Sequence, residues 1–225
     1  MIRQTVIPIE YDDEHSLNQF YGERNRVLIA ELQDLAAGLR RSGLIYLWGG
    51  EGSGKTHLLL GCCQHARRHQ RRARYINLLQ SDVCDVQEGK EDIVCVDAIE
   101  CIAGERNREE EVFALYEHCQ AIKASMVIAG PAPLGNLEFS LPDLPSRLGR
   151  GGSYALADIS DLEKQAAIQS REKLRGMDVT DSVAEFMLSH YGRDMKSLFA
   201  LLDRLDSESL KFQRRITIPF LKSLG

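Results

Sequence analysis

The segment from Tyr46 to Thr56 constrains the fold of this chain more than any other part of the sequence. It reads Tyr-Leu-Trp-Gly-Gly-Glu-Gly-Ser-Gly-Lys-Thr, so that Gly49, Gly54, Lys55 and Thr56 match the pattern G-x-x-x-x-G-K-[ST]. In such a loop the glycines let successive backbone N–H groups point at phosphate oxygens. The lysine adds a positive charge, and the threonine hydroxyl can ligate Mg²⁺. The pattern therefore predicts a site for the phosphates of a nucleotide.

The flanking sequence supplies the strand and the helix that this loop requires. Leu44–Trp48 is an apolar run typical of a buried strand, and His57–Cys63 begins a helical stretch. A phosphate would lie at the N-terminus of that helix, which favours a phosphate site over a glycine-rich turn that binds nothing. The predicted cofactor-binding residues are Gly49, Gly50, Glu51, Gly52, Ser53, Gly54, Lys55, Thr56 and His57, together with Asp97 and Lys196.

The composition is that of an ordinary globular protein. The 225 residues are 44% hydrophobic and 27% charged, which suits one α/β domain with a small second domain. The net charge of −5 gives no overall attraction to nucleic acid or to an anionic membrane. The six cysteines form no C-x-x-C pair, and no apolar run approaches the roughly 20 residues of a membrane span. We therefore expect a soluble protein of the reducing cytoplasm.

Short apolar runs alternate with helical stretches before residue 158. Besides 44–48, strands are predicted near residues 74–79, 93–96, 125–129 and 154–156. Helices are predicted near residues 25–40, from the phosphate loop to about 69, at 109–123 and within 144–148. Strands that alternate with helices form a parallel sheet covered on both faces, so the predicted fold class is α/β.

Beyond residue 158 the sequence predicts helices alone. Ser160 and Glu163 form a capping box that opens the first helix, and Thr180 caps the second. Two more amphipathic helices are predicted near 195–205 and 217–224. We therefore expect three parts: an extended N-terminal arm of residues 1–22, an α/β nucleotide-binding core of residues 23–157, and a small helical domain of residues 158–225.

The strand near residues 93–96 ends in a carboxylate, Asp97. A protein with this phosphate loop needs an acid near the Mg²⁺, bound directly or through water, so Thr56 and Asp97 are the predicted metal ligands. Many such ATPases place a second acid next, to activate water. Here that position is Ala98, which cannot take a proton, and Glu100 is expected to point elsewhere. The site is predicted to hold nucleotide and to hydrolyse it poorly.

Two further positions bear on hydrolysis. The strand near residues 125–129 leads into Gly130 and Pro131, which offer no polar side chain to a γ-phosphate. Lys196 could reach over the phosphates from the helical domain, or it could be a solvated lysine on a helix surface. Both positions weaken the case for an enzyme with its own turnover.

Arg147 lies on a short helical segment at the edge of the predicted core. An arginine there can enter the nucleotide site of a neighbouring subunit, where it accelerates hydrolysis by about 10³–10⁵. The alternative is an ion pair with Asp143 or another nearby acid. The basic run Arg67–Arg74 complements the dipole of the helix that it ends, and contact with nucleic acid is the less favoured interpretation.

Four stretches give the chain a family resemblance: Val96–Gly104, Leu141–Arg147, Arg204–Asp206 and Gln213–Lys222. With the phosphate loop, they resemble the AAA+ core of the DnaA family of replication initiators, and more closely the Hda family of DnaA-related regulatory inactivators. The resemblance covers nearly the whole chain. It implies a parallel five-stranded AAA+ core with a helical lid domain, and no helix-turn-helix domain for origin DNA.

The resemblance also implies a function. Hda proteins bind the DNA-loaded sliding clamp, the β subunit of DNA polymerase III, through an N-terminal peptide. They then promote hydrolysis of the ATP held by DnaA, which prevents re-initiation of replication. Residues 4–9 are similar to that peptide: Gln4 can hydrogen-bond while Ile7 and Ile9, on either side of Pro8, enter an apolar groove. Arg147 matches the arginine that the family presents in trans to the nucleotide of DnaA.

Ala98, Pro131 and Lys196 depart from the residues that support hydrolysis in this family. They suit a member that holds ADP (or ATP), with or without Mg²⁺, has no robust ATPase of its own and lends Arg147 to DnaA. Two alternatives are a DnaA-like or helicase-loader-type ATPase with its own turnover, and an interaction scaffold that binds no nucleotide. A homodimer is left open, and contact with DNA is expected to be indirect or weak.

Overall fold

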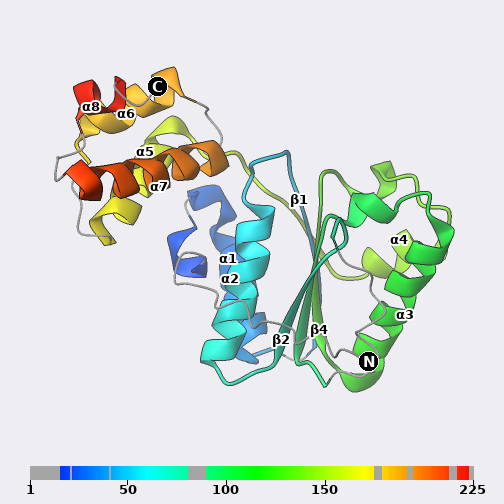
Figure 1. Cartoon of the computed structure of the whole chain (residues 1–225). Helices are drawn as coiled ribbons and strands as arrows, with labels where there is room; N and C mark the ends of the chain where they lie inside the picture. Colours follow the sequence, from blue (N-terminus) through cyan, green and yellow to red (C-terminus); the bar gives the residue numbers. More distant parts are fainter. Residues whose placement is uncertain are drawn as a thin grey trace, which may run out of the picture.

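The computed structural model (Figure 1) describes residues 16–20, 22–40, 42–80, 90–174, 179–191, 195–212 and 217–222. These residues form a layered α/β core and a group of C-terminal helices. Within the same ranges, no helix combines the length and the apolar character needed to cross a lipid bilayer.

The described strands build one parallel sheet in the order β2-β3-β4-β1-β5. They are β1 (Leu44–Trp48), β2 (Ala73–Asn77), β3 (Ile93–Asp97), β4 (Ser125–Gly130) and β5 (Gly152–Ala155). Each lies at or next to a predicted apolar run, which confirms the predicted α/β class. Because the strands are parallel, the carboxyl ends of β1, β3 and β4 meet at one edge. The phosphate loop, Asp97 and Gly130 therefore lie at that edge.

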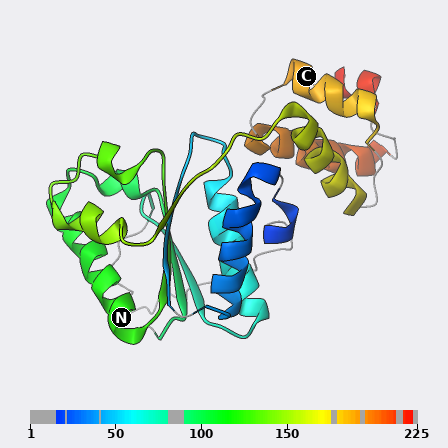
Figure 2. The same ribbon diagram turned by 180° about the vertical axis from the view of Figure 1, so that it is seen from behind.

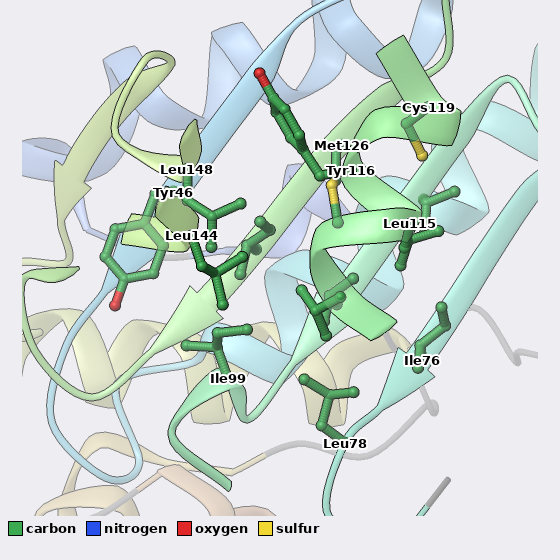
Figure 3. Packing of buried hydrophobic residues seen from close by; sticks show 14 of the residues in the cluster. Tyr46, Ile76, Leu78, Ile99, Leu115, Tyr116, Cys119, Met126, Leu144 and Leu148 are labelled. Carbon is green, nitrogen blue, oxygen red and sulfur yellow. The ribbon is translucent and has the colours of Figure 1, made fainter. Parts of the chain in front are cut away.

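Helices cover both faces of this sheet, as Figures 1 and 2 show from opposite sides. On one face lie α1 (Arg26–Ala37) and α2 (Lys55–Arg68), which enclose an apolar cluster with β1, β3 and β4. On the other face lie α3 (Arg106–Ile122) and α4 (Asp143–Leu148), which share a second cluster with Tyr46 of β1. Figure 3 shows Leu144 and Leu148 of α4 beside Tyr46 in this cluster.

The C-terminal helices have a hydrophobic core of their own. They are α5 (Asp161–Leu174), α6 (Asp181–His190), α7 (Met195–Phe212) and α8 (Ile218–Lys222). Ile168, Met187, Leu198, Leu202 and Leu221 have no exposed area and pack together there. Burial on this scale stabilises each such side chain by roughly 1.5–3 kcal/mol relative to exposure.

The residues just before α1 pack on the core. Short 3₁₀ helices form at η2 (Leu17–Gln19) and η3 (Glu23–Asn25), and Ser16 Oγ accepts a hydrogen bond from the N–H of Asn18 at the start of η2. Leu17 is only 2% exposed and belongs to the cluster under α1 and α2. The described end of the predicted extended arm is thus a buried turn, because its apolar side chains have a core to enter. Two further 3₁₀ turns, η5 (Ile99–Ile102) and η6 (Leu134–Asn136), follow β3 and β4.

Candidate nucleotide site and the surface around Arg147

The phosphate loop turns sharply between β1 and α2. The N–H of Gly49 donates to the carbonyl of Gly130 at 3.2 Å, which fixes the start of the loop to the end of β4. Gly52 and Gly54 have φ values of 74° and 94°, in the left-handed region that favours glycine. The loop can therefore curl so that α2 begins directly at Lys55.

Several polar groups of this loop have no protein partner. Within the described residues, the N–H groups of Gly52, Gly54, Lys55 and Thr56 donate to no protein acceptor. The Ser53 hydroxyl is buried and also has none. A Cβ on Gly50 would meet no atom within 4 Å, so the loop has open space beside it. Amides at a helix N-terminus next to open space fit a phosphate group.

Lys55 holds its ammonium group over the loop. Its Nζ donates to the carbonyl oxygens of Gly49 at 2.7 Å and Gly50 at 2.8 Å. Partial burial lowers the pKa of Lys55, and the negative charges of Glu100, Asp97 and Glu51 act in the opposite direction. The cation is thus close to the predicted phosphate position, where it also offsets the nearby carboxylates.

Thr56 and Asp97, the predicted metal ligands, are in contact. Thr56 Oγ1 donates to Asp97 Oδ2 at 2.6 Å, and the hydroxyl of Tyr75 donates to the same oxygen at 2.9 Å. Asp97 Oδ1 accepts from the N–H of Ala98 at 2.9 Å, and the carboxylate is only 5% exposed. A hydroxyl that donates its proton keeps its lone pairs for a cation, so this pair fits Mg²⁺ bound with a nucleotide. Tyr75 was not predicted as part of the site.

The position next to Asp97 carries no acid. Ala98 adopts φ 60° and ψ 47°, a left-handed conformation that alanine rarely takes. The chain then enters η5, where Glu100 is exposed. Glu100 raises the pKa of Lys55 more than Asp97 does. The negative charge of Glu100 therefore acts on the Lys55 ammonium group, while the direction of the Glu100 side chain stays a prediction.

The space beside the end of β4 is occupied by the side chain of Tyr46 from β1. The Tyr46 hydroxyl, buried in the sheet face under α3 and α4, donates to the carbonyl of Ala132 at 2.5 Å. A Cβ on Gly130 would collide with this hydroxyl and with Ile99. Burial, and secondarily the charge of Glu100, raise the pKa of Tyr46. There is no room at Gly130 for a side chain that could reach a γ-phosphate.

The segment before α1 contacts the first turn of α2. A Cβ on Gly54 would collide with the ring of Phe20, and the rings of Phe20 and His57 lie 5.9 Å apart. His57 Nε2 lies 3.2 Å from the carbonyl oxygen of Ser16. The His57 side chain thus ties this segment to α2, while its backbone remains in the helical turn predicted to meet phosphate.

Residues of η3 fasten the C-terminal helices to the core. The Asn25 side chain donates to the carbonyl of Ala157 at 3.2 Å and accepts from the N–H of the same residue at 3.0 Å. Glu163 Oε1 accepts from the N–H of Glu23 at 3.0 Å. Glu163 Oε2 accepts from the Ser160 N–H at 2.8 Å, which forms the predicted capping box. One carboxylate therefore serves both the start of α5 and its attachment.

The helix α4, which carries Arg147, lies on the opposite side of the sheet from α1 and α2 (Figures 1 and 2). Leu144 and Leu148 of α4 are fully buried, whereas Arg147 is half-buried. Its guanidinium has no hydrogen-bond or ion-pair partner within the described residues, and no ion pair with Asp143 forms. The alternative of an ion pair with Asp143 is therefore not formed in this structure.

A buried carboxylate anchors the loop that leads to α4. Glu109 has no exposed area. Its Oε1 accepts from the N–H groups of Gly104 at 2.8 Å and Ser140 at 2.9 Å, and its Oε2 accepts from the N–H of Leu141 at 2.6 Å. Nothing in the sequence near Glu109 indicates this role, because Ser140 and Leu141 lie more than 30 residues further along the chain.

Arginines of the basic run at the end of α2 form hydrogen bonds and ion pairs with other parts of the core. Arg67 donates to the carbonyl of Ala73 at 3.0 Å, and Arg71 donates to the carbonyls of Ala36 and Asp92. Arg72 and Arg74 lie within 4 Å of carboxylates on the neighbouring segment. These contacts engage the run within the protein, and its role in complementing the helix dipole stays a prediction.

The remaining predicted residues have no described contacts. Gln4, Ile7, Pro8 and Ile9 lie outside the described residues. Lys196 belongs to α7, but its side chain also lies outside the described part of the chain. Their roles stay predictions from the sequence.

Residues 161–224 match the family model described as the Hda lid domain. Among solved structures, domain III of the replication initiation protein DnaA from Thermotoga maritima has a TM-score of 0.79 and 18% identity, covering 93% of this chain and 95% of that one. DnaA from Aquifex aeolicus bound to AMPPCP has a TM-score of 0.68 and 18% identity, covering 85% and 66%.

The Thermotoga maritima RuvB Holliday junction branch migration motor is also similar, with a TM-score of 0.67 and 20% identity over 93% of this chain and 70% of that one. Identities this low establish the fold and no more. Together with the lid match, these structures confirm the predicted AAA+ fold: a parallel sheet flanked by helices and followed by a helical lid domain.

Proposed function

We propose that this chain, an AAA+ protein related to Hda and DnaA, regulates the initiation of DNA replication by promoting hydrolysis of the ATP held by DnaA. In this proposal the chain binds a nucleotide at its own phosphate loop as a structural ligand, and supplies Arg147 to the nucleotide of DnaA. It does so while bound to the DNA-loaded sliding clamp through residues 4–9.

The placement of Arg147 carries this proposal. The guanidinium has no partner within the described residues, although buried Leu144 and Leu148 on either side of it fix the helix. It lies across the sheet from α1 and α2, the face that packs beside the phosphate loop. An arginine placed in this way cannot easily serve its own site, and it is available to a site on another molecule. Such an arginine in trans is worth about 10³–10⁵ in rate.

The nucleotide site supports a bound diphosphate better than turnover. The unpartnered loop amides, the Lys55 cation and the Thr56–Asp97 pair suit phosphate and Mg²⁺. Ala98 and Pro131 leave out two of the polar groups that the family resemblance associates with hydrolysis. DnaA from Aquifex aeolicus, a structural relative, was solved with AMPPCP. We infer that ADP is the resident nucleotide and that it sets the angle of the lid domain through the contacts of Asn25 and Glu163.

The charge of Glu100 near Lys55 keeps one alternative open. If Glu100 orients a water molecule, the chain is a DnaA-like or helicase-loader-type ATPase. Steady-state hydrolysis by the purified chain would then reach about 1 s⁻¹ or more, as in ordinary enzymes. A scaffold without nucleotide is a second alternative, and it predicts no stabilisation of the chain by millimolar ADP.

The proposal is tested by following hydrolysis of ATP preloaded on DnaA, with the clamp loaded on DNA. Wild type is compared with Arg147→Ala, with Gln4→Ala, and with Arg150→Ala, a matched removal of an exposed arginine near the end of α4. We expect stimulation by wild type and by Arg150→Ala. We expect at least about a 10³-fold loss with Arg147→Ala, and a loss with Gln4→Ala that more clamp partly restores. Equal stimulation by all four proteins would remove both assignments.

A further inference from the structure

Tyr75 of β2 reaches Asp97 across the sheet. In the register of β2 and β3, Tyr75 lies opposite Cys95 and Asn77 lies opposite Asp97, so Tyr75 and Asp97 form a diagonal pair. Side chains two residues apart on a strand point to the same face, and a tyrosine is long enough to span such a diagonal. That face is the one covered by α2, whose first turn carries Thr56.

Three donors converge on the Asp97 carboxylate from three different elements. The hydroxyls of Tyr75 and Thr56 both donate to Oδ2, at 2.9 and 2.6 Å, and the N–H of Ala98 donates to Oδ1. Hydrogen bonds to an ionised carboxylate are stronger than those between neutral groups and fix its orientation. With only 5% of Asp97 exposed, water cannot easily replace a lost donor.

The direction of the Thr56 proton depends on this carboxylate. A hydroxyl has one proton and two lone pairs, so a Thr56 that donates to Asp97 presents its lone pairs to any cation beside it. If Asp97 rotated, the Thr56 proton could turn into the place of the cation. Tyr75, as the second donor on the same oxygen, opposes that rotation.

We propose that Tyr75 is a positioning residue for a divalent cation bound with the nucleotide: through Asp97 it holds the Thr56 hydroxyl in the orientation that ligates the ion. The inference rests on the nucleotide site of the proposed function, but not on Arg147 or the clamp. Removing a group that hydrogen-bonds to a metal ligand, without touching the metal itself, typically changes metal affinity by about 10–100-fold.

The test is ADP binding by the purified full chain, freed of nucleotide, with Mg²⁺ or with a chelator in its place. Tyr75→Phe removes only the hydroxyl. Tyr116→Phe makes the same change in the apolar cluster on the other face of the sheet and serves as the control. We expect Mg²⁺ to tighten ADP binding by wild type and by Tyr116→Phe. In Tyr75→Phe we expect that Mg²⁺-dependent gain to fall by about 10-fold, with metal-free affinity unchanged.

Each other outcome has one meaning. An unchanged Mg²⁺-dependent gain in Tyr75→Phe overturns the positioning role, and so does an equal loss of affinity with and without Mg²⁺, which indicates lost packing. A wild type that binds ADP without any effect of Mg²⁺ overturns the cation site while leaving the nucleotide site intact. A wild type that does not bind ADP at all contradicts the nucleotide site of the proposed function.

Discussion

Glu109 provides the sharpest test of how the surface around Arg147 is built. Its carboxylate has no exposed area and accepts hydrogen bonds from the N–H groups of Gly104, Ser140 and Leu141. Two of these amides belong to the loop that leads into α4. In Glu109→Gln the side chain keeps its shape, but one carboxylate oxygen becomes an NH₂ group that faces an N–H donor.

The expected loss of stability follows from these contacts. A hydrogen bond to a charged group contributes about 1.5–3 kcal/mol, and the glutamine loses at least one of the bonds and weakens the others. Removing a buried charge offsets part of this loss. We therefore expect Glu109→Gln to lower the free energy of unfolding of the core by about 2–4 kcal/mol. Glu110→Gln on the same helix breaks only an exposed pair with Arg106 and should change it by less than about 0.5 kcal/mol.

Urea unfolding followed by the fluorescence of Trp48 measures this difference. Trp48 is the chain's one tryptophan, and it packs against the apolar cluster that α3 and α4 share, so its emission reports on the core and not on the lid domain. Amide hydrogen exchange at Ser140 and Leu141 should also accelerate in Glu109→Gln alone. If the two variants unfold at the same urea concentration, the buried carboxylate does not anchor the loop and the reasoning is refuted.

Three further changes test other parts of the structure. Ala98→Gly should raise the free energy of unfolding by about 0.5–1 kcal/mol in the same urea assay. A left-handed alanine costs about 1–2 kcal/mol, and the greater freedom of glycine in the unfolded chain offsets part of the gain. A lower free energy of unfolding would show that the alanine conformation is unstrained. Gly130→Ala should lower the free energy of unfolding by about 1–3 kcal/mol, because the new methyl group collides with the Tyr46 hydroxyl. Adding Tyr46→Phe to this variant should restore part of the lost stability. If the stability losses of the two substitutions simply add, the collision is contradicted. Hydrogen bonds from Ser160 lower the pKa of Glu163 from its ordinary value of 4.5, so the stabilisation of the α5 start is complete above that value and is lost as pH falls through the lowered pKa. The Ser160 amide shift in an NMR titration should follow this loss, and it should stay flat in Glu163→Gln; a titration that is equal in both would contradict the capping box.

Much of the sheet and one side of the site could be predicted from the sequence. The loop from Gly49 to Thr56 encodes both a conformation and a chemistry, and the apolar run that ends at Asp97 places a carboxylate at the same sheet edge. These features depend on neighbours in the chain or on the rule that parallel strands end together. Local patterns are therefore sufficient to find them.

The missed residues depend on contacts between distant parts of the chain. The hydrogen-bonded residues lie far apart in the sequence: Tyr75 and Asp97 are separated by 22 positions, Glu109 and Leu141 by 32, and Asn25 and Ala157 by 132. Periodicity predicts which face of a strand or helix is buried, but it does not say which polar group faces which. The left-handed turn at Ala98 was missed for another reason, since no glycine signals it.

The most direct test of the central claim asks which molecule hydrolyses its nucleotide. DnaA is preloaded with labelled ATP, this chain is preloaded with a non-hydrolysable analogue, and the two are mixed with the clamp on DNA in a single-turnover experiment. We predict that labelled ADP forms on DnaA as fast as when this chain carries unlabelled ATP, and that the rate collapses with Arg147→Ala. If hydrolysis requires a hydrolysable nucleotide on this chain, or if Arg147→Ala is as active as wild type, the account is contradicted.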